Sequence, residues 1–259
     1  MTARGFGFRS VWLVLAVLLA GGCGVDSAER GAGGGGGQAA GAAGEKTGEA
    51  RAALVAGAGS VGDCNGNPAR CAAVSLAAGA QHTLALQSSG TVWAWGDNGS
   101  GQLGDTAIGS QNMPVQVSAL TGVIAIAAGD RYTIALKSDG TVWGCGANGQ
   151  GQLGNGVQQM APSGIVQAGL SNVSAIAAGN YHAVALTSNG TVWTWGGNNF
   201  GQLGLGYPLT PQLTPTMVPG LTNITAVAAG YYFTLALESD GTVWAWGDNA
   251  SGQLERRTG

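Results

Sequence analysis

Short apolar runs separated by glycine-containing turns follow one another through most of the chain. Residues 123–128 are apolar at successive positions, which favours a strand that is covered on both faces. Residues 132–136 form a second run, which the turn at 138–140 connects to residues 141–143. A weaker run at 113–117 contains a proline, which suits an edge strand. The pattern predicts four short antiparallel strands in about 50 residues.

This group of strands recurs along the chain. Every copy carries Ala-Ala-Gly, Ala-Leu, Gly-Thr-Val-Trp and Gly-Gln-Leu in the same order. Matches at one constant offset indicate a duplicated unit that buries its faces against its neighbours. We therefore divide the repeats, which span 77–254, into 77–126, 127–176, 177–227 and 228–254. Repeated four-stranded antiparallel sheets predict an all-β fold, a β-propeller.

The repeated motif resembles that of the regulator of chromosome condensation family. Residues 77–104 read Ala-Ala-Gly-x-x-His-Thr-Leu-Ala-Leu-x-x-x-Gly-Thr-Val-Trp-x-Trp-Gly-x-Asn-x-x-Gly-Gln-Leu-Gly. The resemblance covers about 71–254 and implies a propeller, which has seven blades in the founding members of the family. Four copies are present here, and the last loses the motif at the tail 255–259 without a fourth strand. We expect an incomplete propeller and favour a truncated sequence as the reason. The alternatives are that the fold closes differently or that the chain assembles with other chains. The stretch before Cys71 could supply the missing strand.

Aromatic residues occupy fixed columns of the repeat. Strand alternation places Trp93 and Trp95 on one face, and Val92 and Ala94 on the other. Most tryptophans fall in the same two columns: Trp93, Trp95, Trp143, Trp193, Trp195, Trp244 and Trp246. Because buried indoles contribute a large hydrophobic free energy, we predict that they form the core between blades rather than a surface that stacks on sugars or bases.

Two further columns belong to turns and loops. A glycine ends each hairpin turn, where it supplies the positive φ of a tight turn: Gly90, Gly140, Gly190 and Gly241. An asparagine recurs after the tryptophans: Asn98, Asn148, Asn198 and Asn249. We expect these asparagines to bond the loop backbone, with ligand or calcium binding as the alternative.

The candidate catalytic residues do not survive comparison between copies. His82 and His182 share their column with Tyr132 and Phe233, so this position requires a ring rather than a base. Cys145 stands in a tryptophan column, which indicates a small buried residue rather than a nucleophile.

No other residues supply a catalytic set. Asp97 and Asp248 have Ala147 and Gly197 as counterparts, so the loop does not require a carboxylate. The glycine-rich runs lack the Lys-Ser/Thr pair of a nucleotide-binding loop. We therefore expect no catalytic residue, metal or cofactor, and keep a propeller-based lyase or hydrolase as an alternative.

Composition and charge restrict the partners further. Glycine accounts for 49 of the 259 residues, which disfavours helical bundles. The formal net charge is -3, and between residues 72 and 254 two basic residues stand against seven acidic ones. Such a surface cannot neutralise a phosphate backbone, so we expect no nucleic-acid partner.

The N-terminal region resembles an export signal. Residues 1–22 carry Arg4 and Arg9 ahead of an apolar run that is too short to span a bilayer. The run ends at Cys23, as in bacterial lipoprotein signals, so we predict lipid attachment to Cys23 and anchoring in the cell envelope; cleavage and secretion is the alternative. Residues 23–60 are rich in Gly and Ala, which predicts a disordered tether.

A lead-in segment at 61–76 separates the tether from the repeats. It contains Cys64 and Cys71. Export would place both thiols in an oxidising compartment, where a disulfide is expected, with two unrelated thiols as the alternative.

These features favour a non-enzymatic, extracytoplasmic interaction module that presents its inter-blade loops to a protein or glycan partner. The family resemblance also implies guanine-nucleotide exchange or chromatin binding, although an exported chain would not meet those partners. The apolar faces of an open propeller would in addition favour self-association.

Overall fold

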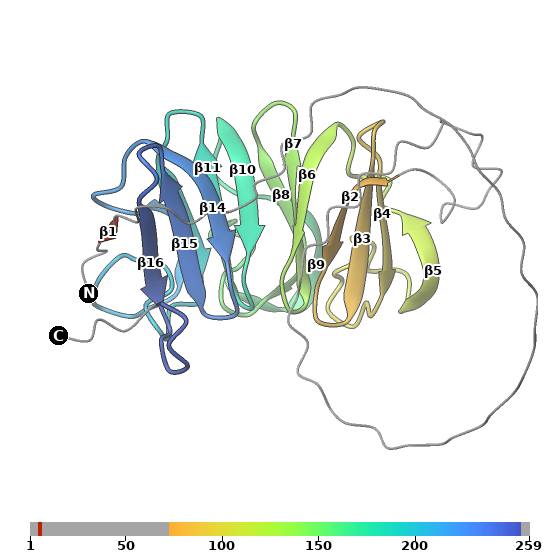
Figure 1. The fold of residues 1–259 in the computed structure, drawn as a ribbon. Helices are drawn as coiled ribbons and strands as arrows, with labels where there is room; N and C mark the ends of the chain where they lie inside the picture. The colour runs from red at the N-terminus through yellow and green to blue at the C-terminus, as the bar shows by residue number, and fades with distance from the viewer. Residues whose placement is uncertain (1–4, 7–72, 255–259) are drawn as a thin grey trace, which may run out of the picture. The chain divides into compact units, whose positions relative to one another are not determined.

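The computed structural model of the protein describes residues 5–6 and 73–254, and it describes no side chains at 5–6, 73–74 and 160–163. These residues form four four-stranded sheets, which lie side by side in chain order (Figure 1). Throughout these ranges there is no helix long and apolar enough to cross a membrane. The predicted all-β propeller architecture is confirmed, and the four sheets form an open series.

Each sheet is an antiparallel meander along the chain. The first contains β2 (Ala73–Ala78), β3 (His82–Gln87), β4 (Val92–Gly96) and β5 (Gln111–Gln116). The second contains β6 (Val123–Ala128), β7 (Tyr132–Lys137), β8 (Val142–Asn148) and β9 (Gln159–Gln167). The third contains β10 (Val173–Ala178), β11 (His182–Thr187), β12 (Val192–Gly196) and β13 (Gln212–Met217). The fourth contains β14 (Ile224–Ala229), β15 (Phe233–Glu238), β16 (Val243–Gly247) and β1 (Gly5–Phe6).

The sheets begin before the repeat boundaries that the sequence suggested. The second repeat was placed at residue 127, whereas β6 begins at Val123 and already contains the Ala-Ala pair. The motif therefore closes the first strand of a sheet instead of opening it. The glycine after the pair is required there, because a Cβ atom on Gly79 would overlap the ring of His82.

A β-bulge interrupts the first strand of every sheet. In β6 the register shifts between Val123 and Ala125, which leaves Ile124 outside the ladder and 55% exposed. The expectation that this strand is covered on both faces was therefore wrong at Ile124. Ser174 and Thr225 occupy the same bulge in later sheets, and their hydroxyl groups donate to backbone carbonyls of the neighbouring strand.

The edge position beside β16 is held by β1. Gly5 pairs with Trp244 and Phe6 pairs with Val243, antiparallel. The strand comes from the stretch before Cys71 that the sequence named as a candidate source. It also lies within the predicted signal peptide, so this pairing and removal of residues 1–22 exclude each other in one mature chain.

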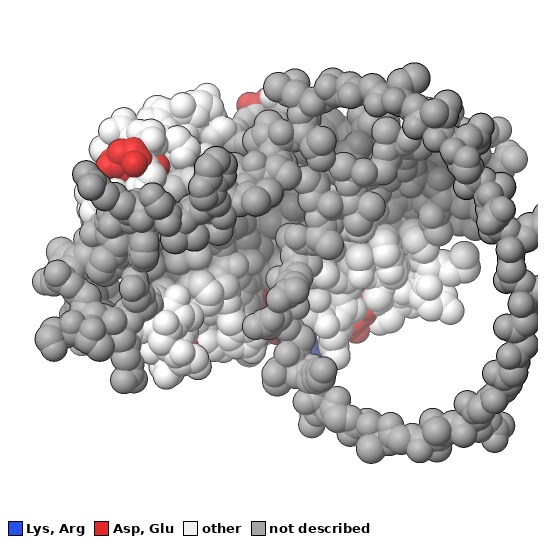
Figure 2. All heavy atoms as spheres, in the orientation of Figure 1, with Lys and Arg blue, Asp and Glu red and all other residues white. Residues whose placement is uncertain are grey.

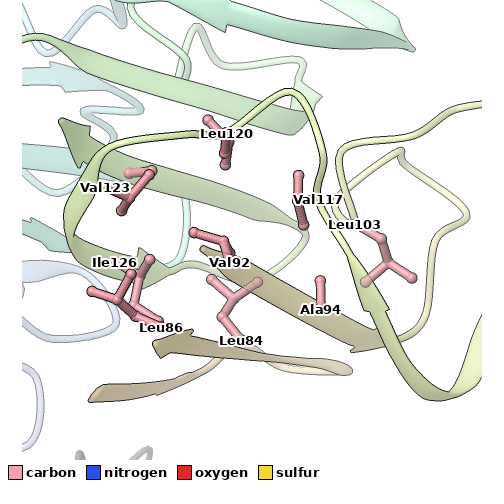
Figure 3. Packing of buried hydrophobic residues seen from close by; sticks show 10 residues of the cluster. Leu84, Leu86, Val92, Ala94, Leu103, Val117, Leu120, Val123 and Ile126 are labelled. Atoms are coloured by element: carbon pink, nitrogen blue, oxygen red, sulfur yellow. The ribbon is translucent and has the colours of Figure 1, made fainter. Parts of the chain in front are cut away.

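The cores lie between consecutive sheets. We call the face of a sheet that packs on the next sheet its leading face, and the opposite face its trailing face. On the first sheet, aliphatic side chains of the leading face gather around Leu84 and Val92 (Figure 3). They pack against Val123, Ile126 and Trp143 of the second sheet. Equivalent clusters fill the other two interfaces, so each sheet is stabilised by its neighbours, as in other repeat proteins.

Candidate functional site

The tryptophan columns lie on the trailing faces. Trp195 and Trp246 are buried, and their Nε1 atoms donate to the backbone carbonyls of Gln152 and Gln202 in the preceding sheet, at 2.9 and 2.8 Å. Three half-buried tryptophans pack at the rims of the same interfaces: Trp143, Trp193 and Trp244. Trp93 and Trp95 occupy the trailing face of the first sheet, where the described residues place no further sheet. The expected packing between blades is not met for these two residues.

The two histidines connect adjacent sheets. Nε2 of His82 lies 3.0 Å from Oγ1 of Thr133, and Nε2 of His182 lies 3.0 Å from Oγ1 of Thr234. Burial lowers the pKa of both histidines to about 4. Both rings are therefore neutral near pH 7 and are placed as structural groups between sheets.

In the second sheet, Tyr132 makes the contact with the next sheet that a histidine makes in the first and third sheets. Tyr132 is fully buried, and its hydroxyl group reaches the backbone carbonyls of His182 and, at 3.1 Å, Gly179 in the third sheet. The residue that faces it is Ala183, where the other interfaces carry threonine. The larger ring of Tyr132 is thus paired with the smaller side chain of Ala183, and the role of this position is to pack adjacent sheets together.

The recurrent asparagines hold the loops that follow the third strands. Their Oδ1 atoms accept from the backbone N–H five residues later, at 2.9 to 3.1 Å: Asn98 from Leu103, Asn148 from Leu153, Asn198 from Leu203 and Asn249 from Leu254. Nδ2 of Asn148 also donates to Val157 O at 2.9 Å. These contacts are internal to the loop and direct no free oxygen toward a metal.

The turn glycines also touch the next sheet. Gly90 has φ of 78°, and its carbonyl accepts from Val123 N at 3.2 Å. The carbonyls of Gly140 and Gly190 accept in the same way from Val173 and Ile224, at 3.1 Å each. Positive φ is therefore needed where the hairpin turns toward its neighbour.

The remaining candidates for chemistry are either buried or outside the described residues. Cys145 is buried in the core, and burial raises the pKa of its thiol to about 12. Cys23, Cys64 and Cys71 lie outside the described residues. Within the part of the chain that the structure describes, no three His, Cys, Asp or Glu residues gather closely enough to hold a metal ion.

An aromatic cluster is the candidate binding site. We call it the aromatic patch and define it by Tyr181, Phe200, Tyr231 and Tyr232. Phe200 stacks on Tyr232 with ring centroids 4.6 Å apart, and Tyr231 meets the same ring edge-on at 4.5 Å. The ring centroids of Tyr181 and Tyr232 are 6.3 Å apart. Tyr231 is 65% exposed and Phe200 is 45% exposed, so the patch offers aromatic surface to a partner.

Short turns between the first two strands of a sheet position the patch. Tyr181 lies in the β10–β11 turn, Tyr231 and Tyr232 lie in the β14–β15 turn, and Phe200 follows β12. Backbone bonds join consecutive turns, because Asn180 N donates to Tyr231 O at 3.0 Å and Asp130 N donates to Asn180 O at 3.2 Å. The aromatic rings therefore stand on a cross-linked support.

A buried amide and an acidic group lie beside the rings. Asn180 is only 4% exposed; its Nδ2 donates to the Tyr232 hydroxyl at 3.2 Å, whereas its Oδ1 has no hydrogen-bond partner. Burial and then the charge of Asp130 raise the pKa of Tyr181, so its hydroxyl group stays protonated near pH 7. The patch thus combines apolar rings with a nearby carboxylate, above a buried amide whose Oδ1 is unpaired.

The sequence predicted variable loops but did not identify these residues. In the motif Ala-Ala-Gly-x-x, the second variable position holds Gln81, Arg131, Tyr181 and Tyr232 in successive copies. The signal was the accumulation of aromatic residues at this position in the last two copies. Recognising it required knowing that turns far apart in the sequence lie next to one another.

Open, serial four-stranded sheets with bonded turns define a repeat protein of the propeller class. Residues 34–258 match the family described as RCC1-like domain, so the chain belongs to that family, as the motif predicted. A stretch of 45 residues is 42% identical to the mitochondrial RCC1 domain-containing protein RUG3 of Arabidopsis thaliana, which covers 17% of this chain and 10% of that protein.

Solved structures share the same fold. Human WBSCR16 is 26% identical with a TM-score of 0.63, over 70% of this chain and 49% of that one. Yeast RCC1 (Prp20), solved with Kap60 bound, is 25% identical with a TM-score of 0.60, over 68% of this chain and 44% of that one. The chain therefore spans less than half the length of these relatives.

Proposed function

We propose that the protein is a non-enzymatic interaction module that binds a protein partner through the aromatic patch. The observation that carries this proposal is the exposure of Tyr231 and Phe200 on cross-linked turns. Tyrosine is enriched at the centres of protein interfaces because it combines apolar area with a hydrogen-bonding group.

Charge defines the kind of protein that the patch favours. The face drawn in Figure 2 shows mostly uncharged residues on its described part, with a few acidic side chains and little basic surface. Asp130 lies close enough to Tyr181 to raise its pKa. A segment carrying lysine or arginine would meet both the carboxylate and the aromatic faces, to which cations are attracted. Support for a protein partner also comes from yeast Prp20, a relative that has been crystallised with Kap60 bound.

The absence of a catalytic role is part of the proposal. Both histidines are buried and neutral between sheets, and Cys145 is a buried thiol. The carboxylate of Asp97 acts on the charge of His82, but burial of the ring outweighs this effect and lowers the pKa of His82. We assign the variable turns, rather than these constant columns, to recognition.

The cellular address that we propose rests on the sequence. Residues 1–22 would direct export, and a lipid on Cys23 would hold the module at the cell envelope, with residues 23–60 as the tether. Labelling cells with a palmitate analogue tests this address. Wild type should carry the label and Cys23→Ala should not, and equal labelling of the two would contradict the anchor.

Site-specific photo-crosslinking in intact cells tests the binding proposal. A photoreactive residue at Tyr231 should yield one protein adduct, and Phe200→Ala in the same chain should reduce its yield at least about fivefold. A photoreactive residue at Met113, which is 59% exposed on β5, is the matched control and should not yield that adduct. Equal adducts from both positions, or capture of glycan alone at residue 231, would refute the protein-binding site.

A further inference from the structure

Within the residues that the structure describes, no sheet packs on the leading face of the fourth sheet. Val243 is 36% exposed, whereas its counterparts in the earlier sheets are fully buried: Val92, Val142 and Val192. Leu235, Leu237 and Leu254 are half-buried, although the leucine, isoleucine and valine residues in these columns of the first three sheets are buried. This face therefore presents the apolar residues that elsewhere form a core with the next sheet.

The described residues also place no sheet on the trailing face of the first sheet. Thr83, Ala85 and Trp95 are half-buried. Their counterparts on the trailing faces of the second to fourth sheets are buried: Thr133, Ala183 and Thr234; Ala135, Ala185 and Ala236; Cys145, Trp195 and Trp246. One chain thus carries both halves of an interface that it already forms three times internally.

The hydrogen bonds between sheets leave matching halves at the two ends. Turn residues donate along the series from Ala80 to Asp130, from Asp130 to Asn180 and from Asn180 to Tyr231. Among the described residues, Tyr231 N–H at one end and Ala80 C=O at the other have no partner in this series. Such groups remain available to a partner that repeats the same surface.

The hydrogen bonds from tryptophan Nε1 to the preceding sheet also leave one donor and one acceptor at the two ends of the series. Trp195 and Trp246 donate to the carbonyls of Gln152 and Gln202 in the preceding sheet. The corresponding donor in the first sheet is Trp95 Nε1, and the corresponding acceptor in the fourth sheet is the carbonyl of Gln253. Neither makes this bond within the described residues, and a Cβ atom on the turn glycine Gly241 would meet no heavy atom within 4 Å, unlike one on Gly90.

We propose that the leading face of the fourth sheet binds the trailing face of the first sheet of a second copy of this chain. Trp95 of one copy would insert beside Leu254 and donate to Gln253 O of the other, as Trp195 and Trp246 do within the chain. The contact is heterologous, because two different surfaces of the chain meet. The contact uses the backbone N–H of Tyr231, but the variants that test it lie at Leu237 and Ala85, outside the aromatic patch.

The state of association of the full chain tests this inference. We would use the chain with Cys23→Ala, so that no acyl group contributes, and measure its mass by sedimentation velocity over a hundredfold concentration range. We expect species at multiples of the 25.5 kDa monomer mass, increasing with concentration. A monomer at every concentration up to about 100 μM would overturn the proposal.

Two variants separate the faces. Leu237→Glu blocks the leading face and Ala85→Glu blocks the trailing face, and each should weaken self-association at least about tenfold. Met113→Glu, at an exposed position on β5, is the control and should associate like wild type. Circular dichroism and the melting temperature establish that each variant is folded.

Mixing the two variants gives the decisive result. Each variant keeps the face that the other lacks, so an equimolar mixture should form a heterodimer through one intact interface. A folded pair that associates no better mixed than alone contradicts the head-to-tail contact. Full association of either variant alone contradicts it as well.

Discussion

His182 and Thr234 are joined across the interface between the third and fourth sheets by a hydrogen bond of determined direction. Thr234 Oγ1 donates to Gln202 O at 2.8 Å, so its single proton is already used. The contact with His182, at 3.0 Å, therefore has Nε2–H as donor and the hydroxyl oxygen as acceptor. His82 and Thr133 repeat this arrangement with Gln102 O. Nδ1 of both rings is buried without a partner, so a proton there would create a desolvated charge.

These histidines make the free energy of unfolding depend on pH. Their folded-state pKa of about 4 lies below the ordinary 6.5. As the pH falls from 6.5 toward 4, the two imidazole rings therefore bind protons in the unfolded chain but not in the folded chain. We expect full stability above pH 6.5 and a loss of at most about 1.4 kcal/mol per pH unit for each histidine below it. Urea denaturation at pH 7, 5.5 and 4.5 measures this loss.

The double variant His182→Tyr with Thr234→Ala is the control, because it copies the Tyr132–Ala183 pair. It should reduce the pH dependence by about one proton while the protein remains folded at pH 7. Carboxylates titrate alike in both proteins and cancel in the difference. An unchanged slope would show that the ring of His182 is not a source of the pH dependence.

The contribution of a tryptophan to the free energy of unfolding should depend on which sheet it belongs to. Trp195→Ala leaves a cavity in a closed interface and an unpaired carbonyl at Gln152, and should cost about 3 to 5 kcal/mol of unfolding free energy. Trp95→Ala, at the same column of the uncovered face, should cost less than half as much in dilute solution. Chemical denaturation of both variants at low protein concentration compares them, and equal losses would contradict the open first sheet.

Asn148 should be more important than its small size suggests. Replacement by alanine would leave the buried Leu153 N without its side-chain acceptor and would remove a part-buried bond to Val157 O. We expect a loss of about 1 to 3 kcal/mol of unfolding free energy, chiefly from the buried N–H group. The control is Asn189→Ala in an exposed turn, which should lower the melting temperature only slightly. An unchanged free energy of unfolding in Asn148→Ala would refute the anchoring role of Asn148.

Cys145 should be unreactive in the folded protein. Burial and a pKa raised to about 12 leave almost no thiolate near neutral pH. In a chain with serine at residues 23, 64 and 71, a thiol reagent such as DTNB should label Cys145 at least about a thousandfold more slowly in buffer than in denaturant. Labelling at comparable rates would place this residue at the surface.

Local pattern was sufficient to identify the strands, the repeat and the family. Alternation in residues 92–95 and the constant spacing of the motif are properties of neighbours in the chain, so they can be read without knowing the fold. The internal comparison also predicted a structural ring at His82 and His182, because Tyr132 and Phe233 fill the same column. The boundary of the unit was misplaced, since the Ala-Ala pair ends a strand whose beginning varies in sequence.

Contacts between sheets were decided by the tertiary structure. The sequence could not separate Trp95 from Trp195, which have the same local motif, because their burial depends on whether another sheet lies in front of them. The aromatic patch likewise joins residues from turns about 50 positions apart, next to Phe200 from a different loop. Chain order alone assigns each residue to a column of the repeat; the three-dimensional stacking of unlike copies determines which columns are buried and which remain free to bind.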